Sequence, residues 1–292
     1  MDVIVQIIAS GLTLGAMYAI STIGLSLVYG SLNMLNMAHG AILTIGGYAA
    51  YAAIQQLGLP PFFGFLGATV VGGAVGLLIF LATAWPLLGS RNFETNIFIA
   101  TIGVGAVLEN IVLKIFGPYA KPQPLSVPGA FKIGAVALPY QNVFILIAAI
   151  VMMAAVAFLL QKTRVGRAIR ATAQNRDAAQ LMGVNVRRVY AQVLAISGAL
   201  AAVSGVMVSS LATLSPTMGG DPMLKAFVIC VVAGLGNTVG AAGAAIAIGL
   251  MEAAAEYIFG VRFGFASLLM LVIVILIWRP SGLFGRTRVV RL

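Results

Sequence analysis

The chain begins its long apolar part with VIVQIIASGLTLGAMYAISTIGLSLVY, residues 3–29, and no Asp, Glu, Lys or Arg occurs from Val3 to Ser90. A helix needs roughly 20 apolar residues to cross a bilayer core of about 30 Å. The charge-free stretch is therefore long enough for several membrane-spanning helices, and Gly58-Leu59-Pro60-Pro61 offers a turn within it. This stretch predicts a polytopic helical membrane protein.

The rest of the chain continues this composition. Of its 292 residues, 61% are hydrophobic and 8% are charged, whereas soluble domains are about 45–50% apolar. We expect one all-α transmembrane bundle, residues 1–292, with about 8–9 spans, some of them broken or re-entrant. Glycine pairs such as Gly11/Gly15 and Gly72/Gly76 predict close helix packing. The expected spans are Val3–Tyr29, Ala38–Leu57, Phe62–Leu88, Thr95–Phe116, Asn142–Gln161, Val189–Thr213, Met223–Leu235, Val239–Phe259 and Phe263–Trp278.

The positions of the basic residues set the expected orientation. The net charge is +10, and the Lys and Arg residues of membrane proteins concentrate in cytoplasmic loops. Seven of them lie between Lys162 and Arg188, and four arginines lie in the tail 279–292. We therefore expect the loop 162–188 and the carboxyl-terminal tail in the cytoplasm and the amino terminus on the outer side of the membrane. The positive net charge is then explained by the orientation of the protein in the lipid bilayer, and no nucleic-acid partner is expected.

Two segments depart from regular spans. The first, Gly30–Gly40, is too long for a tight turn and too apolar for a solvated loop, so we expect it to dip back into the protein. The second, Met223–Leu235, is short for a full crossing and continues into an irregular link that contains Gly236 and Asn237. Broken elements at comparable places in two halves of a transporter indicate a substrate pathway.

The basic segment Thr163–Gly183 is predicted to be an amphipathic helix. Its apolar residues follow helical spacing, while arginines occupy the other positions. Either Asn175 or Asp177 would cap a short second helix that ends at Gly183. Two interpretations stay open: the helix rests on anionic lipid headgroups, or it docks into a groove on a soluble subunit.

Six motifs along the chain resemble signatures of the branched-chain amino acid ABC transporter permease family, and the chain looks more like its LivH-type subunit than its LivM-type companion. The resemblance spans nearly the whole sequence. The motifs are Asn36-Met37-Ala38-His39-Gly40, Ile99-Ala100-Thr101-Ile102-Gly103, Gly166-Arg167-Ala168 through Gly183-Val184-Asn185, Met223-Leu224-Lys225-Ala226-Phe227, Gly234-Leu235-Gly236-Asn237 and Arg279-Pro280-Ser281-Gly282-Leu283-Phe284-Gly285.

The resemblance implies that Arg164–Gly183 is a cytoplasmic coupling helix seated in an ATPase subunit. It also implies a second permease subunit, LivM-like or another copy of this chain, two ATP-binding cassette subunits and a periplasmic substrate-binding protein. ATP would be bound by the partner subunits, since this chain contains no Gly-Lys-Ser/Thr loop, and no cofactor of its own is expected. The residues expected to couple to the ATPase are Arg167, Arg170, Arg176, Asp177, Leu181, Met182 and Gly183.

Polar residues at membrane depth are costly and indicate a pathway or a buried pair. His39 is the only histidine, which excludes a two-histidine metal site, and a structural hydrogen-bonding role stays open for it. For each carboxylate, a structural role likewise stays open beside a pathway role. The candidates for the substrate pathway are Asn36, His39, Glu109, Asn237 and Glu252.

Two pairs of charged residues lie close enough in the sequence to interact, one by repulsion and one by attraction. Glu252 and Glu256 lie one helical turn apart, so their repulsion should keep one of them protonated. Asp221 and Lys225 flank an expected external loop and would form an ion pair at its mouth.

The sequence favours transport without chemistry. One His, one Cys and seven acidic residues provide few acid-base or metal sets, so an enzyme is not expected. The leading hypothesis is alternating access driven by separate ATPase subunits. The alternative is an ion-coupled secondary transporter that uses the intramembrane carboxylates Glu109, Glu252 or Glu256. The solute stays open between branched-chain amino acids, urea and short amides.

Overall fold

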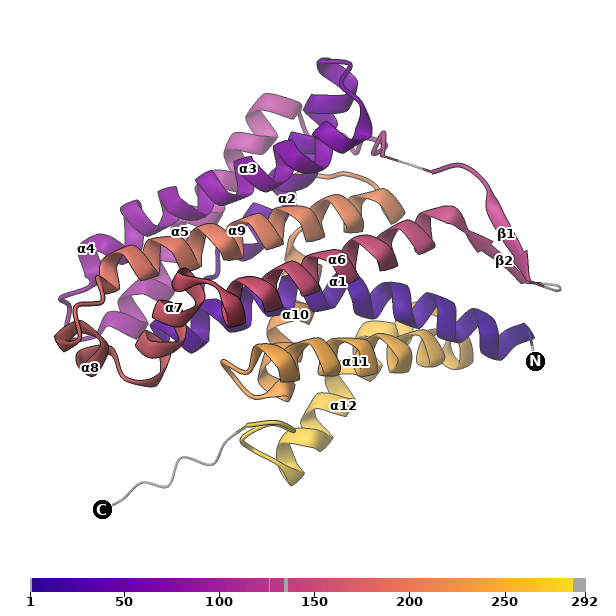
Figure 1. Ribbon diagram of the computed structural model, residues 1–292. Helices are drawn as coiled ribbons and strands as arrows, with labels where there is room; N and C mark the ends of the chain where they lie inside the picture. Colours follow the sequence, from indigo (N-terminus) through magenta and orange to yellow (C-terminus); the bar gives the residue numbers. More distant parts are fainter. Residues whose placement is uncertain (1, 126, 134–135, 286–292) are drawn as a thin grey trace.

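The computed structural model describes residues 2–125, 127–133 and 136–285, and the chain is mainly helical (Figure 1). Arg286, Arg288 and Arg291 of the expected basic tail lie outside the described residues. The helices are α1 (Asp2–Leu32), α2 (His39–Tyr51), α3 (Pro61–Ile79), α4 (Trp85–Leu87), α5 (Phe93–Phe116), α6 (Tyr140–Lys162), α7 (Arg164–Gln174), α8 (Arg176–Leu181), α9 (Val186–Leu211), α10 (Gly220–Ala233), α11 (Thr238–Phe259) and α12 (Gly264–Trp278).

Three short turns complete the helical elements. A π-helical turn, Ala52–Gln56, extends α2, and a second one, Phe80–Ala84, joins α3 to α4. A 3₁₀ turn, Val261–Phe263, leads into α12. An antiparallel hairpin that the sequence did not predict, β1 (Ala130–Ile133) and β2 (Val136–Pro139), lies between α5 and α6.

Within the described ranges, seven helices are long and apolar enough to cross a membrane. They confirm an all-α polytopic membrane protein. The two other spans expected from sequence correspond to α2 with its π-helical turn and to α10, which has only 14 residues. The seven long helices are Val3–Leu32, Pro61–Leu87, Phe93–Phe116, Tyr140–Lys162, Val186–Leu211, Thr238–Phe259 and Val261–Trp278.

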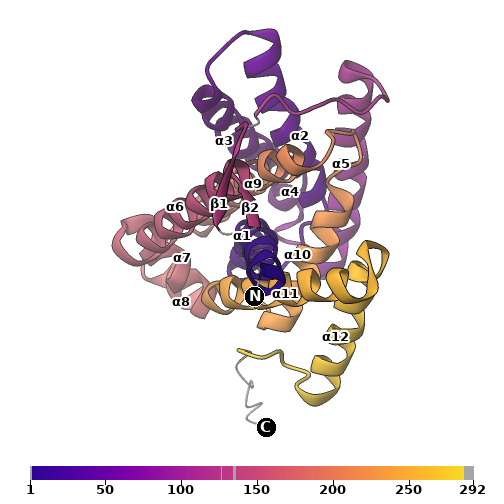
Figure 2. The ribbon, with the colours of Figure 1, turned by 90° about the vertical axis from the view of Figure 1, so that its right-hand side faces the viewer.

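Helices α1 and α9 form the centre of the bundle. Figure 2 looks almost along α1 and shows α6, α9, α10 and α11 around it. In the most apolar stretch of α9, 72% of the residues are buried inside the protein, whereas in that of α6 only 17% are buried. The outer helices therefore present apolar side chains outward, which a lipid environment accepts and water does not.

Glycines bring the central helices into close contact, as the sequence predicted. A Cβ atom on Gly15 would lie 2.7 Å from the Cα of Ile246 in α11, and one on Gly76 would lie 2.1 Å from the carbonyl oxygen of Leu194 in α9. Neither position has room for a side chain. The spacings Gly11/Gly15 and Gly72/Gly76 therefore serve helix packing, α1 on α11 and α3 on α9.

The two ends of the bundle are distinct. At one end, which we call the basic end, α7 and α8 lie beside the last turn of α1, and the Asn33 amide donates to the Glu94 carboxylate (Figure 1). At the other, the hairpin end, the β hairpin projects and the backbones of Lys121 and Leu214 exchange hydrogen bonds of 2.8 and 2.9 Å. The basic loop 162–188 and the β hairpin therefore lie at opposite ends of the bundle (Figure 1).

Candidate functional site

Two short helices, α2 and α10, meet at their amino ends inside the protein. A Cβ atom on Gly40 would lie 2.8 Å from the Gly219 carbonyl oxygen, and one on Gly219 would lie 1.9 Å from the Gly40 carbonyl oxygen. The Gly219 N–H also donates to Oγ1 of Thr44 at 3.1 Å. We call this contact between Gly40 and Gly219, at the amino ends of α2 and α10, the half-helix junction.

The half-helix junction lies within the thickness of the bundle rather than at either end. Nε2 of His39, the first residue of α2, is 3.1 Å from Oγ of Ser21 in α1. At 1.5 Å per residue α1 is about 46 Å long, and Ser21 lies roughly 16 Å before its carboxyl end. Residues 33–38 must therefore return from the basic end into the bundle. The sequence predicted this path for Gly30–Gly40, but Gly30–Leu32 belong to α1 and His39–Gly40 belong to α2.

Hydrogen bonds hold this re-entrant segment. Asn33 takes a left-handed backbone conformation with φ of 55°, which Asn adopts more readily than most residues. The Met37 N–H donates to Oγ1 of Thr101 in α5 at 3.1 Å, and the Ala38 N–H donates to Oδ1 of Asn36 at 3.1 Å. Non-helical backbone is thus satisfied by protein groups, as membrane depth requires.

Asn36 and His39 lie together at the half-helix junction, and both are fully or nearly fully buried. Among the described residues, Nδ2 of Asn36 and Nδ1 of His39 have no hydrogen-bond partner. A buried polar atom without a partner costs free energy, so it is expected where something else binds or a conformational change occurs. These atoms make the junction a candidate for contact with a polar solute.

Glu252 forms an ion pair that the sequence did not predict. Its Oε1 is 2.5 Å from Nζ of Lys225, which is also 2.9 Å from the hydroxyl of Tyr18. The Lys225 side chain is 18% exposed and that of Glu252 is 1% exposed. This cluster joins α10, α11 and α1, and Tyr18 lies one turn from Ser21 on α1.

The expected pairing of Lys225 with Asp221 is therefore wrong. Both residues lie within α10, which begins at Gly220, and the lysine side chain is directed to α11 instead of along its own helix. The expected repulsion between Glu252 and Glu256 stays a prediction, with the Lys225 ammonium paired to Glu252. Sequence spacing missed this pair because its partners are 27 residues apart and belong to different helices.

Two of the expected pathway residues lie away from the half-helix junction. Asn237 caps α11 by accepting from the Gly240 N–H at 2.9 Å and donates to the Phe284 carbonyl at 3.1 Å. Glu109 lies on α5, partly exposed, beside Asn110. The structure thus gathers Asn36 and His39 at the junction, places Glu252 in the adjacent ion pair, and leaves Asn237 and Glu109 apart.

The basic segment forms two capped helices, α7 and α8. Oγ1 of Thr163 accepts from the Gly166 N–H at 3.0 Å, and Oδ1 of Asn175 accepts from the Ala178 N–H at 2.9 Å. Asn175, not Asp177, is therefore the cap of the second helix. Gly183 follows with φ of 84°, the left-handed conformation that suits a helix end.

Most of the residues expected to couple to an ATPase lie on the surface of α7 and α8. Leu181 is 88% exposed and Met182 is 85% exposed, at the tip of the segment. The other residues expected to couple are also exposed, namely Arg167, Arg170, Arg176, Asp177 and Gly183. The apolar tip with charges around it is typical of a surface that docks on another protein.

Arg170 differs from the other basic residues. Its Nη1 donates to the Leu160 carbonyl oxygen near the end of α6 at 2.5 Å, so the guanidinium is directed back toward the bundle.

Comparison with known proteins identifies the family. The profile described as "Branched-chain amino acid transport system / permease component" matches residues 7–278. This chain is a member of that family. Its members are transport components, which are not a class of enzyme, and the chain is accordingly a multi-pass protein of the inner membrane.

Relatives of this permease cover almost its entire length. The high-affinity branched-chain amino acid transport system permease protein BraD of Pseudomonas aeruginosa is 30% identical, over 97% of this chain and 96% of its own. The corresponding protein LivH of Escherichia coli is also 30% identical, over 96% and 95%. A probable LivH of Methanocaldococcus jannaschii is 28% identical, over 90% and 87%. No solved structure gives a significant match.

Proposed function

We propose that this permease carries branched-chain amino acids through the inner membrane as part of an ABC importer, and that the half-helix junction lies on the solute pathway. The observation that carries the proposal is the meeting of α2 and α10 at Gly40 and Gly219, inside the membrane, in a chain of this family. Broken helices at the middle of a bilayer are the common way in which transporters build a solute site.

The electrostatics of the half-helix junction suit an amino acid. Helix amino ends carry partial positive charge, and two such ends converge here. A carboxylate in the pathway would be stabilised by both dipoles. Asn36 and His39 offer unpaired polar atoms at the same place, and neither adds a fixed charge that would trap the solute.

The path of the chain supports nine crossings. The re-entrant residues 33–38 together with α2 make one crossing, and residues 212–219 together with α10 make another, in addition to the seven long helices. We assign the basic end to the cytoplasm, because its loop 162–188 carries seven Lys and Arg residues against one acid. The amino terminus and the hairpin then lie in the periplasm, and the carboxyl end of α12 lies on the cytoplasmic side.

We further propose that α7 and α8 form the coupling surface for an ATP-binding cassette subunit. The support is the capped, compact shape of the segment and the exposed pair Leu181 and Met182 at its tip. Exposed apolar side chains of this size are costly in water and are commonly covered by a partner. The complete importer would contain two such ATPases, a second permease subunit and a periplasmic binding protein.

Replacing Leu181 with aspartate should reduce the amount of ATPase that co-purifies with the permease by at least about tenfold, because it places a charge in a desolvated contact. The measurement is the subunit ratio after affinity purification from membranes. Val127→Asp, an exposed apolar residue near the hairpin, serves as the matched control and should leave the ratio unchanged. Equal ratios for both variants would remove α8 from the coupling surface.

Uptake of radiolabelled leucine in cells tests the proposed function as a whole. We expect it to require this permease and an intact Walker lysine in the ATPase. Uptake that survives loss of the ATPase but collapses with the ion gradient would instead support an ion-coupled carrier. Competition by urea or short amides, without competition by isoleucine or valine, would reassign the solute.

A further inference from the structure

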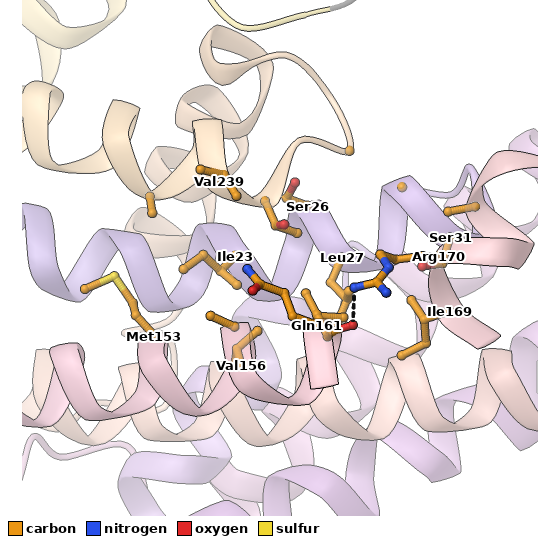
Figure 3. A pocket seen from close by; sticks show the side chains of 17 residues that line it. Ile23, Ser26, Leu27, Ser31, Met153, Val156, Gln161, Ile169, Arg170 and Val239 are labelled. Carbon is orange, nitrogen blue, oxygen red and sulfur yellow. Dashed lines mark hydrogen bonds between the residues drawn. The ribbon is translucent and has the colours of Figure 1, made fainter. Parts of the chain in front are cut away.

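A hollow of about 420 Å³ lies between α1, α6 and α11 and is closed at the basic end by α7 (Figure 3). Its walls are mostly apolar, with Ile23 and Leu27 from α1, Met153 and Val156 from α6, and Val239 from α11. Val239 is 79% exposed, so the hollow is open to the surroundings of the bundle on this side. In a membrane protein those surroundings are acyl chains.

Arg170 stands at the end of this hollow. Figure 3 draws the hydrogen bond from its guanidinium to the Leu160 carbonyl as a dashed line. A guanidinium has five N–H donors, and within the described residues Arg170 makes neither a salt bridge nor a second hydrogen bond. A cation with free donors is thus held where the apolar wall ends.

A second hollow, of about 640 Å³, adjoins the first beyond Arg170. Its lining is more polar than that of the first hollow and includes Asn33, Gln174 and Asn237 beside Leu235 and Phe284. Both hollows share the walls formed by Gly30, Arg170, Ala173 and Gly236. An apolar space therefore passes into a polar one, and the guanidinium marks the boundary.

We infer that these two hollows bind one anionic phospholipid from the leaflet at the basic end. An acyl chain occupies the apolar hollow, the phosphate pairs with Arg170, and the rest of the headgroup fills the polar hollow. Basic pockets between transmembrane helices at the headgroup level suit anionic lipids. The order of apolar wall, cation and polar wall matches the order of chain, phosphate and headgroup in a phospholipid.

The hollows are separate from the proposed solute pathway. No residue of α2 or α10 lines either of them. Bound lipid would instead contact α6, α7 and α11 together. Its phosphate would pair with the N–H groups of Arg170 that do not bond to Leu160. This lipid site therefore does not depend on the proposed function.

Native mass spectrometry of the full chain in detergent tests the inference. The chain is titrated with dioleoyl-phosphatidylglycerol and, separately, with dioleoyl-phosphatidylcholine. We expect one phosphatidylglycerol to bind at least about fivefold more tightly than phosphatidylcholine, a preference that Arg170→Ala abolishes. Arg167→Ala removes an exposed arginine of the same helix that lines neither hollow, and it should retain the preference.

A second pair of variants tests the apolar hollow. Ala157→Phe fills part of it and should weaken both lipids, whereas Ala154→Phe, exposed on the same helix but outside the lining, should weaken neither. Inorganic phosphate in hundredfold excess over lipid should not displace phosphatidylglycerol. Equal binding by the wild-type chain and Arg170→Ala, displacement by phosphate, or a dimer of this chain that Ala157→Phe dissociates would each overturn the lipid site.

Discussion

Replacing Lys225 with methionine should lower the free energy of unfolding by about 3–5 kcal/mol, because it leaves the Glu252 carboxylate buried without its partner. The carboxylate is 1% exposed and has its only described cation at 2.5 Å. Reversible unfolding of the full chain in mixed micelles, followed by circular dichroism, measures the change. The effect should be among the largest of any single polar substitution in this permease.

Two further variants separate the ion pair from the lysine itself. The double variant Lys225→Met/Glu252→Gln removes both charges and should recover most of the lost stability. Lys114→Met, an exposed lysine at the end of α5, should change stability by no more than about 0.5 kcal/mol. If the double variant is as unstable as Lys225→Met, the loss comes from packing and not from the unpaired charge.

The same cluster connects stability to transport. Lys225 lies on α10, Glu252 on α11 and Tyr18 on α1, so the pair fixes the half-helix beside the junction to two full-length helices. We therefore expect the double variant to fold yet to transport more slowly, since α10 has lost its charged anchor. Glu252 is thus a positioning residue beside the pathway in this arrangement.

Gly219→Ala should reduce transport at least about tenfold while the protein still reaches the membrane. Its Cβ would lie 1.9 Å from the Gly40 carbonyl oxygen, well inside contact distance, so α2 and α10 must move apart. Overpacking of this kind costs roughly 1–3 kcal/mol where the neighbours can shift. Uptake per molecule of permease, with the amount in the membrane determined by immunoblot, gives the measurement.

Gly220→Ala provides the matched control for that result. It is the next residue, and a Cβ there would meet no atom within 4 Å, so transport should stay within about twofold of the wild-type value. Equal losses in both variants would show that glycine is needed for backbone freedom at the start of α10. Full activity of Gly219→Ala would contradict a closely packed half-helix junction.

Several features of this permease could be predicted from the sequence because each depends on a short window of residues. Absence of charge from Val3 to Ser90 is enough to require lipid-facing helices. The helices α7 and α8 follow from arginine spacing, a cap at Asn175 or Asp177, and Gly183, since capping is a contact over three residues, and the structure selects Asn175. The re-entrant segment before His39 follows from a stretch too long for a tight turn and too apolar for a solvated loop.

Other features were decided only by the tertiary structure. The Lys225 and Glu252 pair, the contact of Gly40 with Gly219, and the turn of Arg170 toward Leu160 each join elements whose mutual placement no local pattern specifies. For this reason closeness in sequence, around an expected external loop, assigned Lys225 to Asp221, although a carboxylate on α11 lay closer. Hydrophobic length and periodicity thus determine that this chain is a bundle of membrane helices. Which polar groups meet inside it depends on how those helices pack.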